Sequence, residues 1–139
     1  MRISTKGRYS ISMLVYLAQH KSKRYITLRE IAENLRISKK YLEQIVPILS
    51  RGNLLRTNRG FQGGYSLAVA PEKCSLGNIL RMTESTLSST EPDSGFNSDD
   101  PTYYVWSGLN EVINDYLDNI SIQDIVDSII QSYANDYVI

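Results

Sequence analysis

Residues 38–44, with the sequence SKKYLEQ, concentrate side chains that could recognise duplex DNA. The carboxamide of Gln44 could form two hydrogen bonds with adenine, and the carboxylate of Glu43 could accept one from N4 of cytosine. Lysines in the same segment could contact phosphates. The candidate contacts here are Ser38, Lys39, Lys40, Tyr41, Glu43 and Gln44. A polar helix face that contacts only water is the alternative interpretation of the same residues.

A second candidate contact lies in the segment TNRGFQGGY, residues 57–65, which combines turn-forming residues with one arginine. Glycine permits tight turns and close approach of the backbone to another surface. An arginine on such a loop could enter a narrow minor groove, where the potential is most negative. We therefore expect a hairpin with Arg59 at its tip and with Asn58 and Gly60 beside it. A phosphate-cradling loop of a nucleotide enzyme is excluded, because the segment lacks Gly-Lys-Ser/Thr and leads into a strand.

The charges of the chain separate at one point, although the formal net charge is zero. All 15 lysines and arginines lie at or before Arg81, together with four acidic residues, which gives that part a net charge of +11. The 11 acidic residues that follow give the remainder −11. Such asymmetry predicts a part that binds a polyanion, joined to a part that stays away from it. Further candidates for phosphate contacts are Arg2, Lys6, Arg8 and Arg51.

Apolar periodicity indicates the elements that would position these residues. We expect a buried helix over residues 8–20 and two short helices over 28–36 and 39–52, joined by a tight turn. Strands over 54–57 and 65–69 would form the hairpin. A further short helix is expected over 76–84, and the predicted N-caps are Thr27, Ser38, Ser75 and Ser121. Two such helices followed by a hairpin form a winged helix-turn-helix, so the expected fold is mainly α with a small two-stranded β wing.

Two prolines are expected to mark helix boundaries. Pro47 lies inside a predicted helix and should kink it or end it early. Pro101, which follows Asp100, should take the first position of a long helix over 101–120. The apolar face of that helix is wider than one contact requires, so we expect a dimerisation helix. The predicted organisation is a winged helix-turn-helix DNA-binding domain over 1–83, a loop over 84–100, and a dimerisation helix with a C-terminal helix and tail over 101–139.

Composition restricts the class of protein. A single cysteine, Cys74, excludes an internal disulfide framework and fits a reducing compartment. No apolar run approaches the length of a membrane span, and the N-terminal segment lacks a secretory apolar region, so we expect a cytoplasmic protein. No spacing of nucleophile, histidine or carboxylate indicates an enzyme. Cys74 precedes a predicted helix, whose dipole could lower the pKa of the thiol, or it is a small residue with a packing role only.

The segments MRISTKGRY, YLEQIV, RGNLLRTNRGFQGGYSLA and VWSGLNEVINDYLDNISIQDIV resemble the Rrf-two family of bacterial winged-helix regulators. The resemblance covers nearly the whole chain, and RGxxGGY is its most distinctive part. It implies a repressor that binds palindromic operators as a homodimer joined near residues 101–120. It also implies a recognition helix around residues 38–44 and a wing centred on Arg59.

The chain departs from the family members that bind an iron–sulfur cluster. Those members carry three cysteines in the loop between the fourth and fifth helices, whereas residues 86–101 here contain none. Iron–sulfur clusters require thiolates or occasional histidines as ligands, so no cofactor and no metal are expected. The cluster-free branch of the family that represses cysteine metabolism is the nearest model.

The C-terminal residues Tyr137, Val138 and Ile139 resemble tails that enter the active site of cysteine synthase. A free C-terminal carboxylate could occupy an amino-acid carboxylate site near a helix N-terminus. A tail packed against its own dimer is the alternative. A different function also stays open, namely a winged helix that docks a protein rather than DNA. Salt separates the two, because binding to phosphates weakens steeply with salt and an apolar contact does not.

Overall fold

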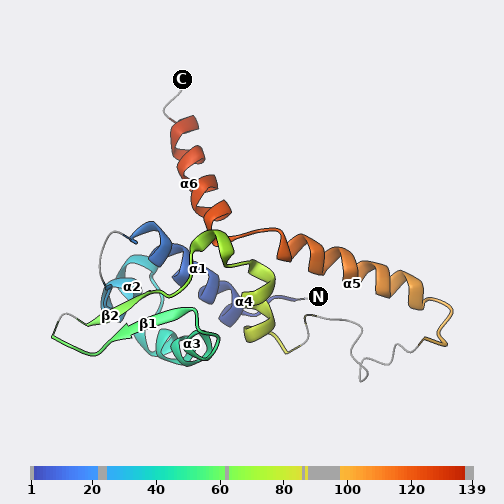
Figure 1. The fold of residues 1–139 in the computed structure, drawn as a ribbon, viewed down its shortest axis with the longest axis horizontal. Coiled ribbons are helices and arrows are strands. Elements are labelled where there is room, and N and C mark those ends of the chain that lie inside the picture. Colours follow the sequence, from blue (N-terminus) through green and yellow to red (C-terminus); the bar gives the residue numbers. More distant parts are fainter. Residues whose placement is uncertain (1, 22–24, 62, 86, 88–97, 137–139) are drawn as a thin grey trace.

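A computed structural model describes residues 2–21, 25–61, 63–85, 87 and 98–136 (Figure 1). It is mainly α-helical with a two-stranded antiparallel sheet, as the sequence predicts. The elements are α1 (Thr5–Gln19), α2 (Leu28–Leu35), α3 (Lys39–Arg51), β1 (Leu55–Asn58), β2 (Gly64–Leu67), the 3-10 helix η1 (Pro71–Lys73), α4 (Leu76–Thr83), α5 (Tyr103–Asp118) and α6 (Ile122–Asp136). Within these residues, no helix has the length and apolar character that would let it cross a membrane.

Short hydroxyl side chains set the starts of the helices. Each accepts a hydrogen bond from the backbone N–H three residues further on, which satisfies one of the free donors of a first helical turn. The predicted caps Thr27, Ser38, Ser75 and Ser121 are confirmed. Ser4 also acts in this way, with its Oγ 3.0 Å from the amide of Gly7. Helix α1 therefore begins at Thr5 rather than at residue 8.

The predicted early end of α3 at Pro47 and the predicted start of α5 at Pro101 are wrong. Helix α3 continues past Pro47 to Arg51, because Ile45 and Leu49, on either side of the proline, are fully buried and hold both turns against the core. Helix α5 begins at Tyr103, two residues after Pro101. Asp100 instead forms a turn before the helix.

The side chain of Asp100 accepts hydrogen bonds from the backbone amide of Thr102 at 2.8 Å and from its hydroxyl at 2.6 Å. These bonds stabilise the charged carboxylate and so lower the pKa of Asp100. The turn uses the residues that would otherwise form the first helical turn.

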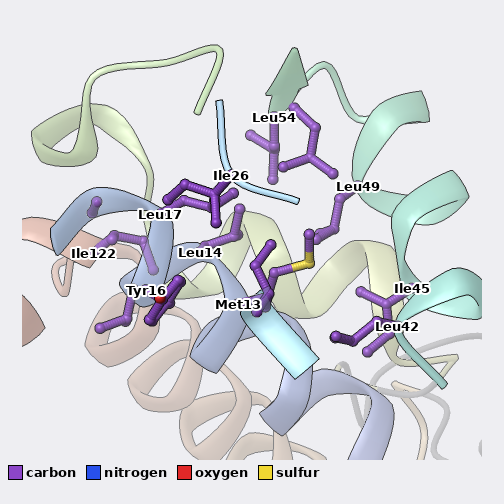
Figure 2. Packing of buried hydrophobic residues seen from close by; sticks show 14 of the residues in the cluster. Met13, Leu14, Tyr16, Leu17, Ile26, Leu42, Ile45, Leu49, Leu54 and Ile122 are labelled. Atoms are coloured by element: carbon purple, nitrogen blue, oxygen red, sulfur yellow. The ribbon is translucent and has the colours of Figure 1, made fainter. Parts of the chain in front are cut away.

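The core surrounds α1, which packs against α2, α3, α4, α6 and β2. Met13, Leu14 and Leu17 are buried almost completely, and Figure 2 shows Met13 directed toward Leu49 of α3. A helix enclosed on most sides has to be apolar on most sides, which explains the weak segregation of polar residues along α1. Full burial of each such side chain contributes about 1.5–3 kcal/mol.

The hairpin is anchored to the helix-turn-helix by backbone hydrogen bonds. The amide of Ile26 donates to the carbonyl of Tyr65 at 2.9 Å, and the amide of Tyr65 donates back at 2.8 Å. Gly64 is required here, because a Cβ atom would collide with the carbonyl of Ile26. The wing is therefore held in a defined position beside α2 and α3.

The strands differ slightly from the predicted ranges 54–57 and 65–69. Leu54 precedes β1. Its amide donates a hydrogen bond to the carbonyl of Leu49, and its carbonyl accepts one from the amide of Ala68. Asn58 pairs with Gly64 at the far end of the hairpin.

Helices α5 and α6 project from the compact body in different directions (Figure 1). They connect to it through a short backbone bridge, in which the amide of Leu76 donates to Ile120 and the amide of Ile122 donates to Cys74, both at 2.9 Å. Arg81 of α4 reinforces this attachment by donating to Asp118 of α5 at 2.7 and 2.9 Å. The last basic residue of the sequence thus pairs with a carboxylate of the acidic part.

Candidate nucleic-acid interface

The first turns of α3 present an exposed polar face. The buried side of the helix is fixed by Leu42, Ile45 and Leu49, each with no solvent exposure. Because side chains three and four residues apart share one face of a helix, the remaining positions have to point outward. The side chains exposed in this way are Lys39, Lys40, Glu43 and Gln44. The structure therefore brings the predicted base contacts and phosphate contacts together on one surface.

Ser38 and Tyr41 are already engaged within the fold. The Ser38 hydroxyl accepts a hydrogen bond from the amide of Tyr41 at 3.1 Å, which uses one of its two acceptor lone pairs. The Tyr41 ring is half-buried and packs edge-on against Tyr9 of α1, with the ring centroids 5.2 Å apart. Both residues position the start of α3 in addition to any contact with a ligand.

The turn between α2 and α3 depends on Arg36, whose φ of 55° is in the left-handed region. Ile37, which follows, is buried and fixes the angle between the two helices. The Arg36 side chain is exposed beside the start of α3, and sequence reasoning did not select it as a contact. Its position two residues before the predicted cap Ser38 is the signal that could have identified it.

The wing loop places Phe61, rather than Arg59, at its centre. Asn58 and Gly64 are the last paired residues, so the loop comprises residues 59–63 and Phe61 is the middle one. Arg59 is the first loop residue and is exposed. The prediction that Arg59 occupies the tip is wrong, because Arg59 lies two residues before the middle of the loop; the predicted loop 58–64 and the observed loop are both centred on Phe61.

Local contacts restrain this loop. The Asn58 side chain accepts a hydrogen bond from the amide of Gly60 at 3.2 Å. At Gly63 a Cβ atom would collide with the carbonyl of Asn58, so only glycine allows the two backbone segments to approach so closely. On β1, Arg56 is exposed and its neighbour Leu55 is buried, because successive side chains of a strand point to opposite faces of the sheet.

The remaining basic candidates lie in two other places. Arg2 and Arg8 are exposed at the start of α1, and Lys6 between them is partly exposed. Arg51 occupies the last turn of α3, where its Nε donates to the carbonyl of Pro47 at 3.3 Å. Arg51 is twelve positions after Lys39, so the two lie about 18 Å apart along the helix axis. Arg51 is therefore not part of the surface formed by the first turns of α3.

Helix α5 carries an exposed apolar stripe. Its members are Val105, Leu109, Val112 and Tyr116, which are 42%, 47%, 65% and 67% exposed. Their spacing of four, three and four residues matches the seam of a coiled coil. Asn114 and Asp118, which contact Arg81, each follow a stripe residue by two positions, about 200° around the helix. The stripe therefore points away from the chain's own domain.

The residues do not fit an iron–sulfur cluster. The whole sequence has one cysteine and one histidine, and no group of three possible metal ligands occurs among the described residues. Cys74 is 1% exposed, and burial raises the pKa of its thiol to about 11. This is opposite to the lowered pKa that the nearby helix N-terminus suggested. Residues 88–97, most of the loop in which the resemblance implied a cluster site, lie outside the described residues, as do Tyr137, Val138 and Ile139.

Comparison with known proteins gives a consistent result. A family model described as "Rrf2: Iron-dependent Transcriptional regulator" matches residues 3–128. The chain is 31% identical over 126 residues to the HTH-type transcriptional regulator CymR of Bacillus subtilis, covering 90% of this chain and 89% of that protein. The solved structure of CymR, titled the global cysteine regulator of B. subtilis, superposes with a TM-score of 0.81 at 29% identity, covering 92% of this chain and 98% of that one. The structure of T. potens IscR gives a TM-score of 0.77 at 33% identity, covering 92% and 88%.

Proposed function

Because this chain belongs to the Rrf2 family of DNA-binding transcriptional regulators, we propose that it is a repressor that binds palindromic operators as a homodimer in the cytoplasm. Its role is regulatory rather than catalytic, since its relatives are named transcriptional regulators. The observation that carries the proposal is the exposed polar start of α3, with the wing locked beside it by the Ile26–Tyr65 hydrogen bonds.

The start of α3 enters the major groove in this proposal. The N-terminal residues of a recognition helix are those that reach base edges in helix-turn-helix proteins. Gln44 and Glu43 are exposed there and offer the groups that pair with adenine and cytosine. Lys39 and Lys40 hold the phosphates beside the groove. Arg59 of the wing reaches the adjacent minor groove, and the start of α1 contacts the backbone through Arg2, Lys6 and Arg8.

Dimerisation uses the stripe on α5. Four large apolar side chains at coiled-coil spacing on an exposed helix are typical of an interaction surface. A second copy of the same stripe complements it under two-fold symmetry, which is the commonest arrangement of homodimers. The two recognition helices would then face two half-sites, and the two-fold axis of the protein would match the palindrome of the operator.

Sulfur metabolism is the process that we propose for the regulated genes. The support is the similarity to the protein whose title is the global cysteine regulator of B. subtilis. In this proposal the tail formed by Tyr137, Val138 and Ile139 binds cysteine synthase, with the terminal carboxylate in the site for an amino-acid carboxylate. Calorimetry with purified cysteine synthase tests it, by comparing the intact chain with one that lacks Ile139. Equal binding by both chains contradicts it.

The central experiment is selection of duplexes from a random pool, followed by affinity measurement over a range of salt. A winged helix that binds phosphates loses affinity steeply, with a log–log slope of about −0.9 for each phosphate neutralised. Lys40→Ala should lower affinity and reduce this slope by about 1. Lys73→Ala is the matched control, because Lys73 is exposed on η1, which packs against the acidic helix α6. Affinity that is independent of salt supports the alternative, a winged helix that docks a protein.

A further inference from the structure

Phe61 is the exception among the exposed apolar side chains of the described residues. The other large ones lie on α5 and α6, whereas Phe61 lies in the wing and is 103% exposed. Isolated exposed apolar residues are common on protein surfaces. What distinguishes Phe61 is the support of its loop, which restrains the backbone on both sides of the residue.

The hairpin carries Phe61 at the point furthest from the body. It is the third of the five residues between the paired Asn58 and Gly64. The loop is restrained at both ends, by the Asn58–Gly60 hydrogen bond and by the close backbone approach at Gly63. Tyr65, next to the last pair of the hairpin, is bonded to Ile26, and the wing projects beyond the helices in Figure 1. A phenyl ring at this point can contact only a surface that the wing approaches.

The charge around Phe61 favours a polyanion as that surface. Residues 44–71 contain no acidic residue and include Arg51, Arg56 and Arg59. Arg56 and Arg59 are exposed on the same hairpin as Phe61. A protein interface would need acidic partners for these arginines and an apolar pocket for the ring. The minor groove supplies both, because it has a negative potential and its walls are formed by apolar deoxyribose carbons.

We propose that Phe61 is an apolar wedge that enters the minor groove beside Arg59 and partly unstacks one base step. This inference rests on the proposed binding of duplex DNA by the wing. Side chains such as phenylalanine open base steps in this way and kink the duplex. Pyrimidine–purine steps open most easily, so Phe61 confers a sequence preference without a hydrogen bond to any base. Phe61 is thus a specificity-determining residue that acts through DNA deformability.

The test uses a duplex selected by the wild-type protein, with 2-aminopurine at the step under the wing. Wild-type binding should increase the 2-aminopurine fluorescence, because the base loses its stacking partner. Phe61→Ala should abolish the increase and weaken affinity about 10-fold, the scale of one aromatic contact with a base. Phe61→Leu should retain most of both, since leucine also serves as a wedge.

Salt separates the wedge from the arginine beside it. Phe61→Ala should leave the salt slope unchanged, because the ring neutralises no phosphate. Arg59→Ala should reduce the slope by about 1 if the guanidinium neutralises a phosphate. A slope that falls in Phe61→Ala as well would show that the ring only positions Arg59, which overturns the inference.

Selection also separates failure of the inference from failure of the proposed function. Duplexes selected by the wild type should contain a pyrimidine–purine step at a fixed distance from the half-site, and those selected by Phe61→Ala should not. If both proteins select the same steps with equal affinity, the wedge is wrong and DNA binding stands. If the wild type selects no duplex, both fail. Thermal unfolding of the two proteins should coincide, since a fully exposed ring stabilises nothing in the fold.

Discussion

The basic part of the chain and the acidic part differ in where their apolar side chains lie. Up to Thr83, the large aliphatic residues of the described part of the chain are buried or half-buried, and most belong to the core around α1. On α5 no residue is buried, and an apolar stripe faces outward. The first part therefore satisfies its apolar surface internally, whereas the second part requires another surface. In the proposed function, this difference assigns DNA recognition to the first part and assembly to the second.

The junction of the two parts combines backbone hydrogen bonds with the packing of α6 against α1. Ser75 and Ser121 form a β-bridge, and their neighbours exchange hydrogen bonds on either side of it. These hydrogen bonds depend little on side-chain identity, because the donors and acceptors belong to the main chain. Packing also fixes the orientation of α6, because α6 contacts α1 and its residues Ile122 and Val126 are buried in the core.

The largest expected effect is loss of assembly on introducing a charge into the stripe. Val112→Glu places a carboxylate where two copies would meet, and an unpaired charge buried at an interface costs several kcal/mol. The variant should be monomeric by light scattering at concentrations at which the wild type is dimeric. Its affinity for a palindrome should fall to that for a single half-site.

Ser128→Glu is the control for that experiment. Ser128 is exposed on α6, two residues from Ile130 and so about 200° around the helix from it. The control introduces the same charge on an acidic helix, and the molecular mass measured by light scattering should stay that of the wild type. If the Val112→Glu protein is still a dimer, the exposed apolar stripe on α5 is not the dimer interface.

The next effect concerns Cys74, at the junction of the two parts. Burial raises the pKa of the thiol to about 11, so the thiolate fraction at pH 8 is about 100-fold lower than for an ordinary cysteine. Alkylation by iodoacetamide should be slower than in urea-unfolded protein by at least this factor. Equal rates would mean that the junction opens readily and that the two parts are loosely joined.

The same pKa predicts the pH dependence of stability. The folded state disfavours the thiolate, so the contribution of Cys74 is fully present below the unfolded pKa and decreases as pH rises above it. Cys74→Ser should remove this dependence between about pH 9 and 11. The measurement is the free energy of urea unfolding for both proteins across that range.

A smaller effect is expected from Gln44 in the basic part. Gln44→Ala should relax preference at one base position by about 1–3 kcal/mol, because it removes a pair of hydrogen bonds to one base. The salt slope should stay unchanged, in contrast to Lys40→Ala. Selection from a random pool with each variant measures both quantities. A uniform loss over all sequences would assign Gln44 to the phosphate backbone instead.

The sequence predicted the features that depend on near neighbours. Caps such as Thr27 and the buried periodicity of α3 are local, so the helices of the winged helix and the polar face at Lys39–Gln44 follow from short segments. The continuation of α3 past Pro47 could not be predicted, because it depends on burial against distant elements. The wing register depends likewise on Ile26 and Leu54, outside the hairpin. Phe61 lies at the middle of the predicted loop as well as of the observed one, but a search for polar contacts did not select it.

The smallest expected effect is the loss of the side-chain pairing between the two parts. Arg81 and Asp118 form an ion pair at 2.7 Å, but both side chains are more than 40% exposed. Water screens such pairs, so Asp118→Asn should cost no more than about 0.5 kcal/mol at pH 7. The hydrogen bond from Arg81 lowers the pKa of Asp118, so the contribution is present above the ordinary pKa of aspartate and is lost as pH falls through the lowered folded value. Unfolding free energies of the wild type and Asp118→Asn should therefore differ at pH 7 and converge in acid.

The control is the exposed ion pair Arg29–Glu33. Both of its residues belong to α2, so Arg29→Ala removes an ion pair without affecting the contact between two elements. If Asp118→Asn instead costs several kcal/mol, the backbone bridge alone does not hold the acidic helices, and Arg81 is the main attachment between the two parts.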